Sequence, residues 1–112
     1  MTIDDLRESA HDASKLLKAM GNERRLLILC HLALGEKSVG ELESLVELSQ
    51  SALSQHLARL RRDGLVRTRR SAQTIYYSLK GEEAAAVMKV LHDLYCAPKL
   101  TRKNPSPVPA TA

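Results

Sequence analysis

The polar side chains between Ser49 and Gly64 could form hydrogen bonds with a surface that carries both donors and acceptors. This stretch reads SQSALSQHLARLRRDG, and at 100° per residue Leu53, Leu57 and Leu60 fall in one narrow arc that must face a core. The opposite side is short or amide-bearing at its beginning and basic toward its end. It offers Gln50, Ser51, Ser54, Gln55, Arg59 and Arg62 for binding. Serine and glutamine suit the edges of base pairs in a major groove, and arginines suit phosphates.

Positive charge continues beyond this helix. Residues 59–70 contain six arginines and one acidic residue, Asp63, although the whole chain carries a formal charge of only +4. We expect Arg69, Arg70 and Gln73 at the tip of a hairpin, where a basic side chain can enter or flank the minor groove of DNA. A solvated arginine-rich face would have the same composition. The short helix before the leucine stretch and the basic hairpin after it favour DNA as the ligand.

The two cysteines, Cys30 and Cys96, could supply thiol chemistry, but their spacing alone does not define it. The sequence contains no Cys-x-x-Cys pair and no zinc-finger spacing. Cysteine is also among the most buried residue types, so two of them in a helical core need no function. His56 should project beside the leucine arc, where packing or an internal hydrogen bond is expected. Without a nucleophile elbow or paired carboxylates in a plausible cleft, the sequence predicts neither an enzyme nor a cofactor.

The elements that position these side chains can be read from helix caps and apolar periodicity. Helices are expected over residues 3–20, 22–34, 38–46, 49–62 and 82–96, with Pro98 stopping the last one. Two β-prone runs, LVRTRR and TIYYSL, are joined by Ser71-Ala72-Gln73 and predict a hairpin. The resulting order, α-α-α-α-β-β-α, is that of a winged helix-turn-helix, a mainly α fold with a β-hairpin.

The length and composition indicate one small domain. We expect residues 1–97 to form the DNA-binding and dimerisation domain, and residues 98–112, which hold four prolines if Pro98 is counted, to form a disordered Pro-rich tail. No apolar run approaches the roughly 20 residues of a membrane span, and the acidic start MTIDDLRESA does not resemble a secretory signal. A cytoplasmic location without membrane contact is therefore expected.

Three segments carry a resemblance to a known family. LLKAMGNERRLLILCHL, SVGELESLVELSQSALSQHLARLRRDGLVRTRR and TIYYSL resemble the ArsR-type winged-helix repressors over roughly residues 14–96, and LSQSALSQHLARLRRDGLV is the most specific part. The resemblance implies a homodimer joined through its first and last helices. It also implies a double-stranded operator with two-fold symmetry and repression lifted by an inducer. On the family's pattern, the best groove contacts are Gln50, Ser51, Ser54 and Gln55.

Departures from the family's metal sensors indicate which inducer to expect. The usual Cys-x-Cys position of the third helix reads SVGEL, and the last helix supplies only His92, Asp93 and Cys96. The two cysteines instead match, by position, the persulfide- and oxidant-sensing BigR- and SqrR-like branch. That match implies that Cys30 and Cys96 lie close together and that reactive sulfur species join them by a disulfide or a longer sulfur bridge, which releases the operator.

Three alternatives stay open from the residues alone. The cysteines could be inert, or the protein could use a winged helix to bind protein partners. A metal-binding site would need at least three ligands. His92 and Cys96 are four residues apart on one helical face, and Cys30 with His31 could approach them. Cys96, near a helix end, is expected to be the more accessible thiol. A lowered pKa there would need a cation such as His31, His92 or a lysine.

Overall fold

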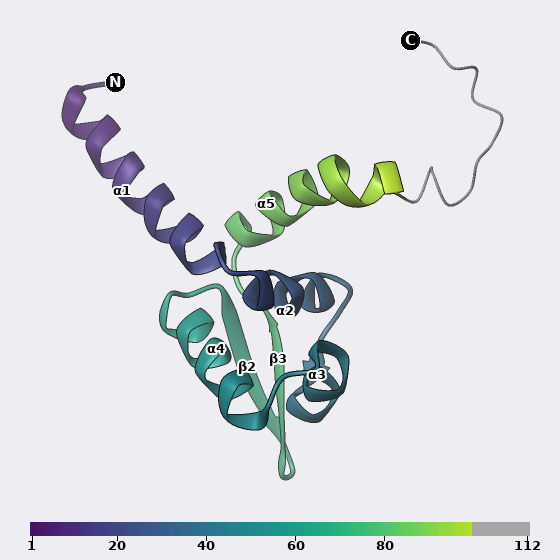
Figure 1. Ribbon diagram of the computed structural model, residues 1–112. Coiled ribbons are helices and arrows are strands. Elements are labelled where there is room, and N and C mark those ends of the chain that lie inside the picture. Colours follow the sequence, from purple (N-terminus) through teal and green to yellow (C-terminus); the bar gives the residue numbers. More distant parts are fainter. Residues whose placement is uncertain (100–112) are drawn as a thin grey trace, which may run out of the picture.

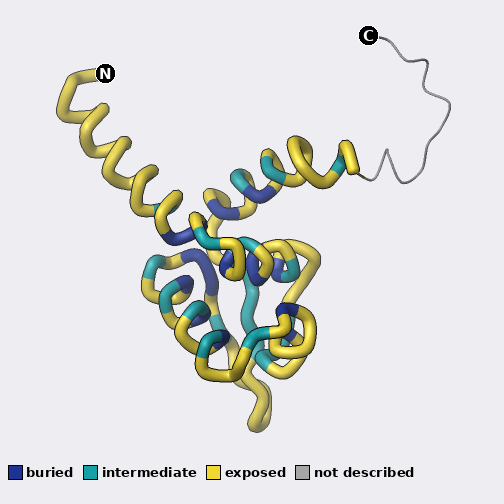
Figure 2. The backbone as a smooth tube through the Cα atoms, in the orientation of Figure 1, coloured by how far each residue is buried: buried dark blue, intermediate teal, exposed yellow. Residues whose placement is uncertain are grey.

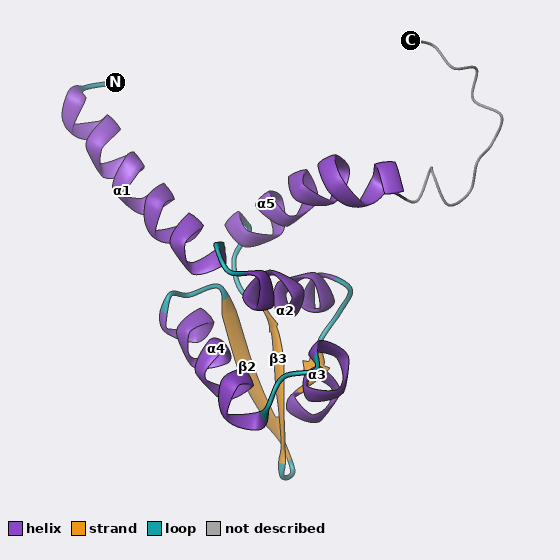
Figure 3. Cartoon of the chain, in the orientation of Figure 1, coloured by secondary structure: helices purple, strands orange, loops and turns teal. Residues whose placement is uncertain are grey.

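The structure, a computed structural model, describes residues 1–99, so most of the predicted Pro-rich tail lies outside the described residues. Its helices are α1 (Ile3–Met20), α2 (Glu23–Ala33), α3 (Val39–Val46), α4 (Gln50–Arg62) and α5 (Glu83–Leu91), followed by a π-helical turn, His92–Cys96. Its strands are β1 (Lys37–Ser38), β2 (Val66–Ser71) and β3 (Thr74–Leu79). This arrangement confirms the predicted winged helix-turn-helix, in which β2 and β3 form the wing (Figure 3).

The core lies between α2, α3, α4 and the root of the wing. The three leucines of the α4 arc are buried, together with Ile28 and Leu29 of α2 and other aliphatic side chains. Figure 1 shows α2 crossing the middle of the molecule, with α3 and α4 below it and the wing projecting past both. Because the chain has no Phe or Trp, this core is built from aliphatic side chains and Met. It holds α4 with its polar side outward.

The sheet has a third strand that the sequence did not reveal. β1 pairs with β3 in an antiparallel register that places Lys37 opposite Tyr77, giving the strand order β1-β3-β2. A strand of two residues shows no alternation, so periodicity cannot detect it. β1 nevertheless fixes the segment before α3 to the wing, and its last residue, Ser38, is also the N-cap of α3.

Two helices leave the body as arms. In Figure 1, α1 and α5 rise from α2 on diverging paths, and Figure 2 shows both largely exposed. The radius of gyration is 17.1 Å, against about 13 Å expected for a compact domain of about 100 residues. The large apolar side chains exposed on the arms are Ile3, Leu6, Leu17, Val90, Leu94 and Tyr95. We call α1, and α5 with its π-turn, the arms.

The end of the last helix differs from the prediction, because Pro98 does not stop it. The chain passes from α5 into the π-turn and stays helical through Lys99. In a regular α-helix, the ring of Pro98 would clash with the carbonyl of Leu94. The π-turn widens the backbone just before this point, where the Ala97 N–H donates to the His92 carbonyl, five residues back. Within the described residues, no helix is both long and apolar enough to span a membrane.

Candidate nucleic-acid interface and thiol groove

Hydrogen bonds at two helix starts fix the position of α4. Ser38 forms a capping box with Glu41, in which each side chain accepts a backbone N–H of the other. The Ser49 hydroxyl accepts the N–H of Ala52 at 3.2 Å and caps α4, while Leu48 packs against the core before it. The α3–α4 turn therefore presents the first turns of α4 in a defined orientation.

The four side chains predicted to read bases are all available for contact. Gln50, Ser51, Ser54 and Gln55 are exposed on α4. Among them, Ser51 has one internal polar neighbour, the Ser49 hydroxyl, at 3.5 Å. The sequence therefore correctly predicted that these side chains lie on the outer face of α4. Their short or amide-bearing ends leave room for a DNA groove to approach.

The arginines of α4 divide between two sides of the helix. Arg62 lines a groove of about 630 Å³ between α4 and the wing, and Ser54, Ile75 and Tyr77 also line it. Arg59 lies on another side, with its Nε 3.6 Å from the Asp63 carboxylate. The structure therefore gives Arg59 an internal partner and leaves Arg62 largely exposed, with only a 3.4 Å contact to Asp63.

Arg61, which was not among the predicted DNA contacts, also lines this groove. It follows Ser54 by seven residues, which is two helical turns, so it lies on the same side of α4. That spacing could have identified it once the wing was placed beside this side of the helix. The groove thus carries two exposed guanidinium groups, which suit a phosphate backbone running between a recognition helix and a wing.

The wing places its three predicted contacts differently. Gln73 is in the two-residue turn with Ala72, whose φ of 54° is the left-handed conformation of such turns, and Arg70 pairs in register with Ile75. Arg69 turns away from the tip and holds Glu36, with a 2.7 Å contact from Nη2 to Oε1. Its guanidinium also lies 4.4 Å from the ring centre of Tyr76.

Glu36 is the second residue that the sequence did not single out. Hydrogen bonds from Arg69 lower the pKa of the Glu36 carboxyl, so the carboxylate stays charged beside the wing. Residues 36–47 contain four glutamates and one lysine, which does not single out Glu36. A pairing across 33 residues leaves no local signal in the sequence. Two nitrogens of the Arg69 guanidinium, Nε and Nη2, are therefore bonded to a carboxylate of the same chain.

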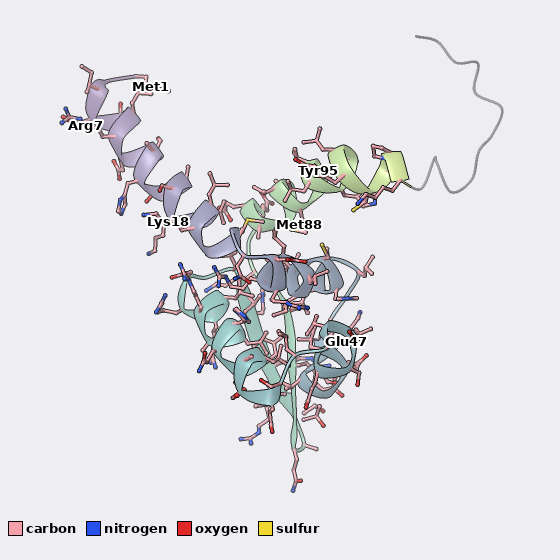
Figure 4. All side chains as sticks on the ribbon, in the orientation of Figure 1. Met1, Arg7, Lys18, Glu47, Met88 and Tyr95 are labelled. Carbon is pink, nitrogen blue, oxygen red and sulfur yellow. The ribbon has the colours of Figure 1, made fainter. Side chains whose placement is uncertain are left out.

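The two cysteines line one groove between α2 and the end of α5. This thiol groove has a volume of about 650 Å³ and is mostly apolar, with Cys30 from α2 and Cys96 from the π-turn. Other side chains that line it are Leu26, Met88, Lys89, His92 and Tyr95. Figure 4 labels Met88 near the root of α5 and Tyr95 farther along the arm. Both cysteines are free and exposed at the residue level.

Burial and charge in the thiol groove act on the Cys30 thiol. The pKa of Cys30 is raised, first by partial burial and then by the charge that Cys96 would carry. Cys30 is therefore held as the thiol. Among the residues that line the groove, Lys89 and His92 are the two with basic side chains. Within residues 1–99, no three His, Cys, Asp or Glu side chains come together as a metal site.

A recognition helix presented with its polar side outward and a basic wing beside it define a winged helix-turn-helix DNA-binding regulator. Residues 22–68 match the model of the bacterial regulatory proteins of the arsR family. The chain is 58% identical over 96 residues to the transcriptional activator HlyU of Vibrio cholerae, covering 86% of this chain and 89% of the relative. The chain therefore belongs to the ArsR family, whose members are transcriptional regulators.

Solved structures agree with this assignment. Reduced HlyU from Vibrio cholerae has a TM-score of 0.81 at 58% identity, covering 84% of this chain and 99% of that one. The repressor BigR from Xylella fastidiosa has a TM-score of 0.77 at 40% identity, covering 86% and 98%. A homodimeric winged helix-turn-helix DNA-binding domain from Mycobacterium bovis has a TM-score of 0.73 at 28% identity, covering 90% and 93%. DNA binding and homodimerisation are typical of the family.

Proposed function

We propose that this protein is a homodimeric transcriptional repressor that releases a two-fold-symmetric operator when reactive sulfur species oxidise Cys30 and Cys96. The observation that carries the proposal is that both cysteines line one groove, although they come from two different helices. Closing a bridge there would join α2, the centre of the DNA-binding body, to an arm. We also propose that the protein works in the cytoplasm, where such a regulator meets its operator.

In the proposed complex, α4 lies in the major groove. Gln50, Ser51, Ser54 and Gln55 contact base edges, because they are exposed on the first turns of α4. Arg62 and Arg61 hold the phosphates of the strand that passes between α4 and the wing. Arg70 and Gln73 reach the adjacent minor groove. Arg59 and Arg69 contribute after leaving their carboxylate partners, so they add less to affinity than their charge suggests.

The proposed dimer is joined through the arms. Both arms expose several large apolar side chains, among them Leu6 on α1, which is 53% exposed, and Val90 on α5, which is 55% exposed. A second copy would cover these faces. Two α4 helices of such a dimer would lie about 34–36 Å apart, in successive major grooves.

The chemistry of the proposed release needs two thiols and one persulfide. The Cys96 thiolate attacks the terminal sulfur of an organic persulfide, RSSH, and displaces RS⁻, leaving a persulfide on Cys96. Cys30 then loses its proton, and its sulfur attacks the inner sulfur of the Cys96 persulfide and displaces sulfide, which takes up the proton as H₂S is formed. The two cysteines lose two electrons, and the products are the Cys30–Cys96 disulfide, RSH and H₂S. Further persulfide could add sulfur atoms to the bridge.

Bridge formation would change the position of an arm. Cys96 belongs to the π-turn, and single π-helical turns within helices are frequently found at functional sites. Pulling it toward α2 would move α5 relative to the body. Because the arms join the dimer, this movement changes the separation of the two α4 helices, and an ångström-scale change is enough to weaken a fixed half-site spacing.

The test measures operator affinity at fixed salt, using a labelled duplex that the protein selects from a random library. Reduced, persulfide-treated and zinc-loaded protein are compared, and mass spectrometry reports the bridge. We expect persulfide to weaken binding and to add an internal bridge. Cys30→Ser and Cys96→Ser proteins should stay bound. If both variants still lose affinity under persulfide, the sensing proposal is wrong, and a loss with zinc alone would favour the metal alternative.

The sign of regulation needs its own measurement, because one relative is named an activator and another a repressor. Transcription from a promoter that carries the selected operator should rise when persulfide is added. A fall would make the protein an activator that uses the same DNA interface. A salt titration addresses the protein-interaction alternative, since binding to DNA through phosphates weakens steeply as salt increases.

A further inference from the structure

A buried arginine lies where α1, α2 and α4 meet. Arg25, in the first turn of α2, is only 7% exposed and is the buried charged residue of the described chain. A cation at this position opposes the dipole of α2, whose amino end already carries a partial positive charge. The α2 start is instead stabilised by Asn22, which accepts the N–H groups of Arg24 and Arg25. The Arg25 side chain therefore serves something other than the stability of its own helix.

The Arg25 guanidinium contacts the last turn of α1. Its Nε donates to the Ala19 carbonyl at 2.6 Å, and its Nη2 donates to the Lys18 carbonyl at 3.2 Å. The last four carbonyls of a helix lack partners within it, and a cation is favourable at this end. Arg25 thus acts as a cap for α1. It fixes the direction in which this arm leaves the body.

The third nitrogen of the same group reaches the recognition helix. Arg25 Nη1 lies 3.5 Å from Nδ1 of His56, in the middle of α4. The contact needs an unprotonated Nδ1, and burial together with the neighbouring arginines lowers the pKa of His56, which keeps the ring neutral. His56 directly follows Gln55, one of the proposed base contacts. Within residues 1–99, no carboxylate forms an ion pair with Arg25, so its partners are these neutral acceptors.

We infer that Arg25 is a positioning residue that joins the end of α1 to α4 through His56, and so sets the angle of the recognition helix relative to the dimer arm. One rigid, planar group with donors on two sides can hold two elements in a fixed relation, which a flexible ammonium cannot. A movement of α1 is thereby passed to α4 without a change in the core. This inference rests on the proposed placement of α4 in the major groove and of α1 in the dimer.

A double-mutant cycle in operator affinity tests the connection. The variants are Arg25→Met, His56→Leu and the double variant, each checked for folding by circular dichroism and for dimer formation by sedimentation. Breaking a hydrogen bond to a charged group corresponds to about tenfold in an equilibrium constant, so each single variant should bind the selected duplex about tenfold more weakly. The double variant should bind the duplex no more weakly than the single variant with the lower affinity, because both changes remove the same connection.

Two further variants separate positioning from other roles. His56→Asn keeps an acceptor near the position of Nδ1 and should recover most of the affinity that His56→Leu loses. Arg7→Met removes the same charge from the far end of α1 (Figure 4) and should change affinity less than twofold. If Arg25→Met does not fold, Arg25→Lys keeps the charge without the planar fork and takes its place in the cycle.

Two outcomes overturn the inference while leaving the proposed function intact. The effects of the single variants could multiply in the double variant, which would mean that His56 contacts DNA independently of Arg25. Folded dimers of all variants could also bind with wild-type affinity, which would make the contact purely structural. If the wild-type protein selects no two-fold-symmetric duplex, the proposed function itself fails and the inference fails with it.

Discussion

Arg69 reaches a carboxylate inside its own chain, and this changes what the residue can do on DNA. The sequence predicted correctly that the α4 side chains Gln50 and Gln55 point outward, because a single helical period fixes their direction. It could not predict the partners of Arg69 or Arg25, because these contacts join residues 33 and 31 positions apart. At the scale of single residues, orientation was predictable and pairing was not.

The Glu36–Arg69 pair predicts a gain of DNA contact in a charge-removing variant. Glu36→Gln should free the Arg69 guanidinium for a phosphate, because the exposed pair would no longer compete with the duplex. The slope of log K against log salt should become steeper by about 0.9, the value for one added phosphate contact. Glu43→Gln, on the exposed face of α3, is the matched control and should leave the slope unchanged. An unchanged slope in Glu36→Gln would contradict this account of Arg69.

His56 predicts a pH dependence of stability. Burial and then Arg25 and Arg24 lower the pKa of His56 below its ordinary value of 6.5. The unfolded chain therefore binds this proton more readily than the folded chain does. The contribution of His56 to the free energy of unfolding is fully present above about pH 6.5 and is lost as the pH falls through the folded-state pKa.

Urea unfolding between pH 5 and pH 8 measures this dependence. The wild type is compared with His56→Asn, which lacks this proton site and shares the other three histidines with the wild type. The free energy of unfolding of the wild type minus that of His56→Asn should decrease as the pH falls. A constant difference across this range would show that His56 keeps an ordinary pKa in the folded protein.

At the scale of elements, caps made the helices predictable. The side chains of Thr2, Asn22, Ser38 and Ser49 accept backbone N–H groups at the starts of α1, α2, α3 and α4. Ser, Thr and Asn are favoured at such positions, so residue type marks these helix starts in the sequence. The strand β1 was missed because two residues carry no period. The π-turn and the helix beyond Pro98 were missed for a different reason, since the widening depends on which carbonyl each N–H selects and not on residue type.

Two serines at the start of α4 predict opposite phenotypes. Ser49→Ala removes the cap hydrogen bond to Ala52 and should lower the free energy of unfolding by about 1 kcal/mol. Ser51→Ala removes an exposed hydroxyl and should leave stability almost unchanged while weakening operator binding. Urea unfolding and fluorescence anisotropy on both variants provide the comparison. Equal stability of the two variants would show that Ser49 does not cap the helix.

At the scale of the whole molecule, the sequence showed apolar stripes but not what covers them. Leu6 and Leu17 belong to a stripe that could have faced the core, and only Ala19 and Met20 of α1 are buried. Helical periodicity gives the same pattern for a core face and for an interface, so only the placement of α1 outside the body distinguishes them. The arms are therefore where the three-dimensional arrangement adds most to the sequence.

The exposed arms predict that dimer formation can be lost without unfolding. Val90→Glu places a charge on the outer face of α5, and because Val90 is 55% exposed in one chain, the fold should survive. Sedimentation should show a monomer with the helical content of the wild type. Leu45→Glu on α3, where Leu45 is 45% exposed and far from the arms, is the control and should remain dimeric. A dimeric Val90→Glu protein would place the interface elsewhere.

Guanine methylation protection on the selected duplex tests the central claim most directly, because it reports contact in the major groove. We predict two protected segments about 10–10.5 base pairs apart from centre to centre, with one dimer bound per duplex. Gln55→Ala should weaken protection in both segments together. A single protected segment, or protection that is unaffected by changes on the first turns of α4, would contradict the placement of paired recognition helices in successive major grooves.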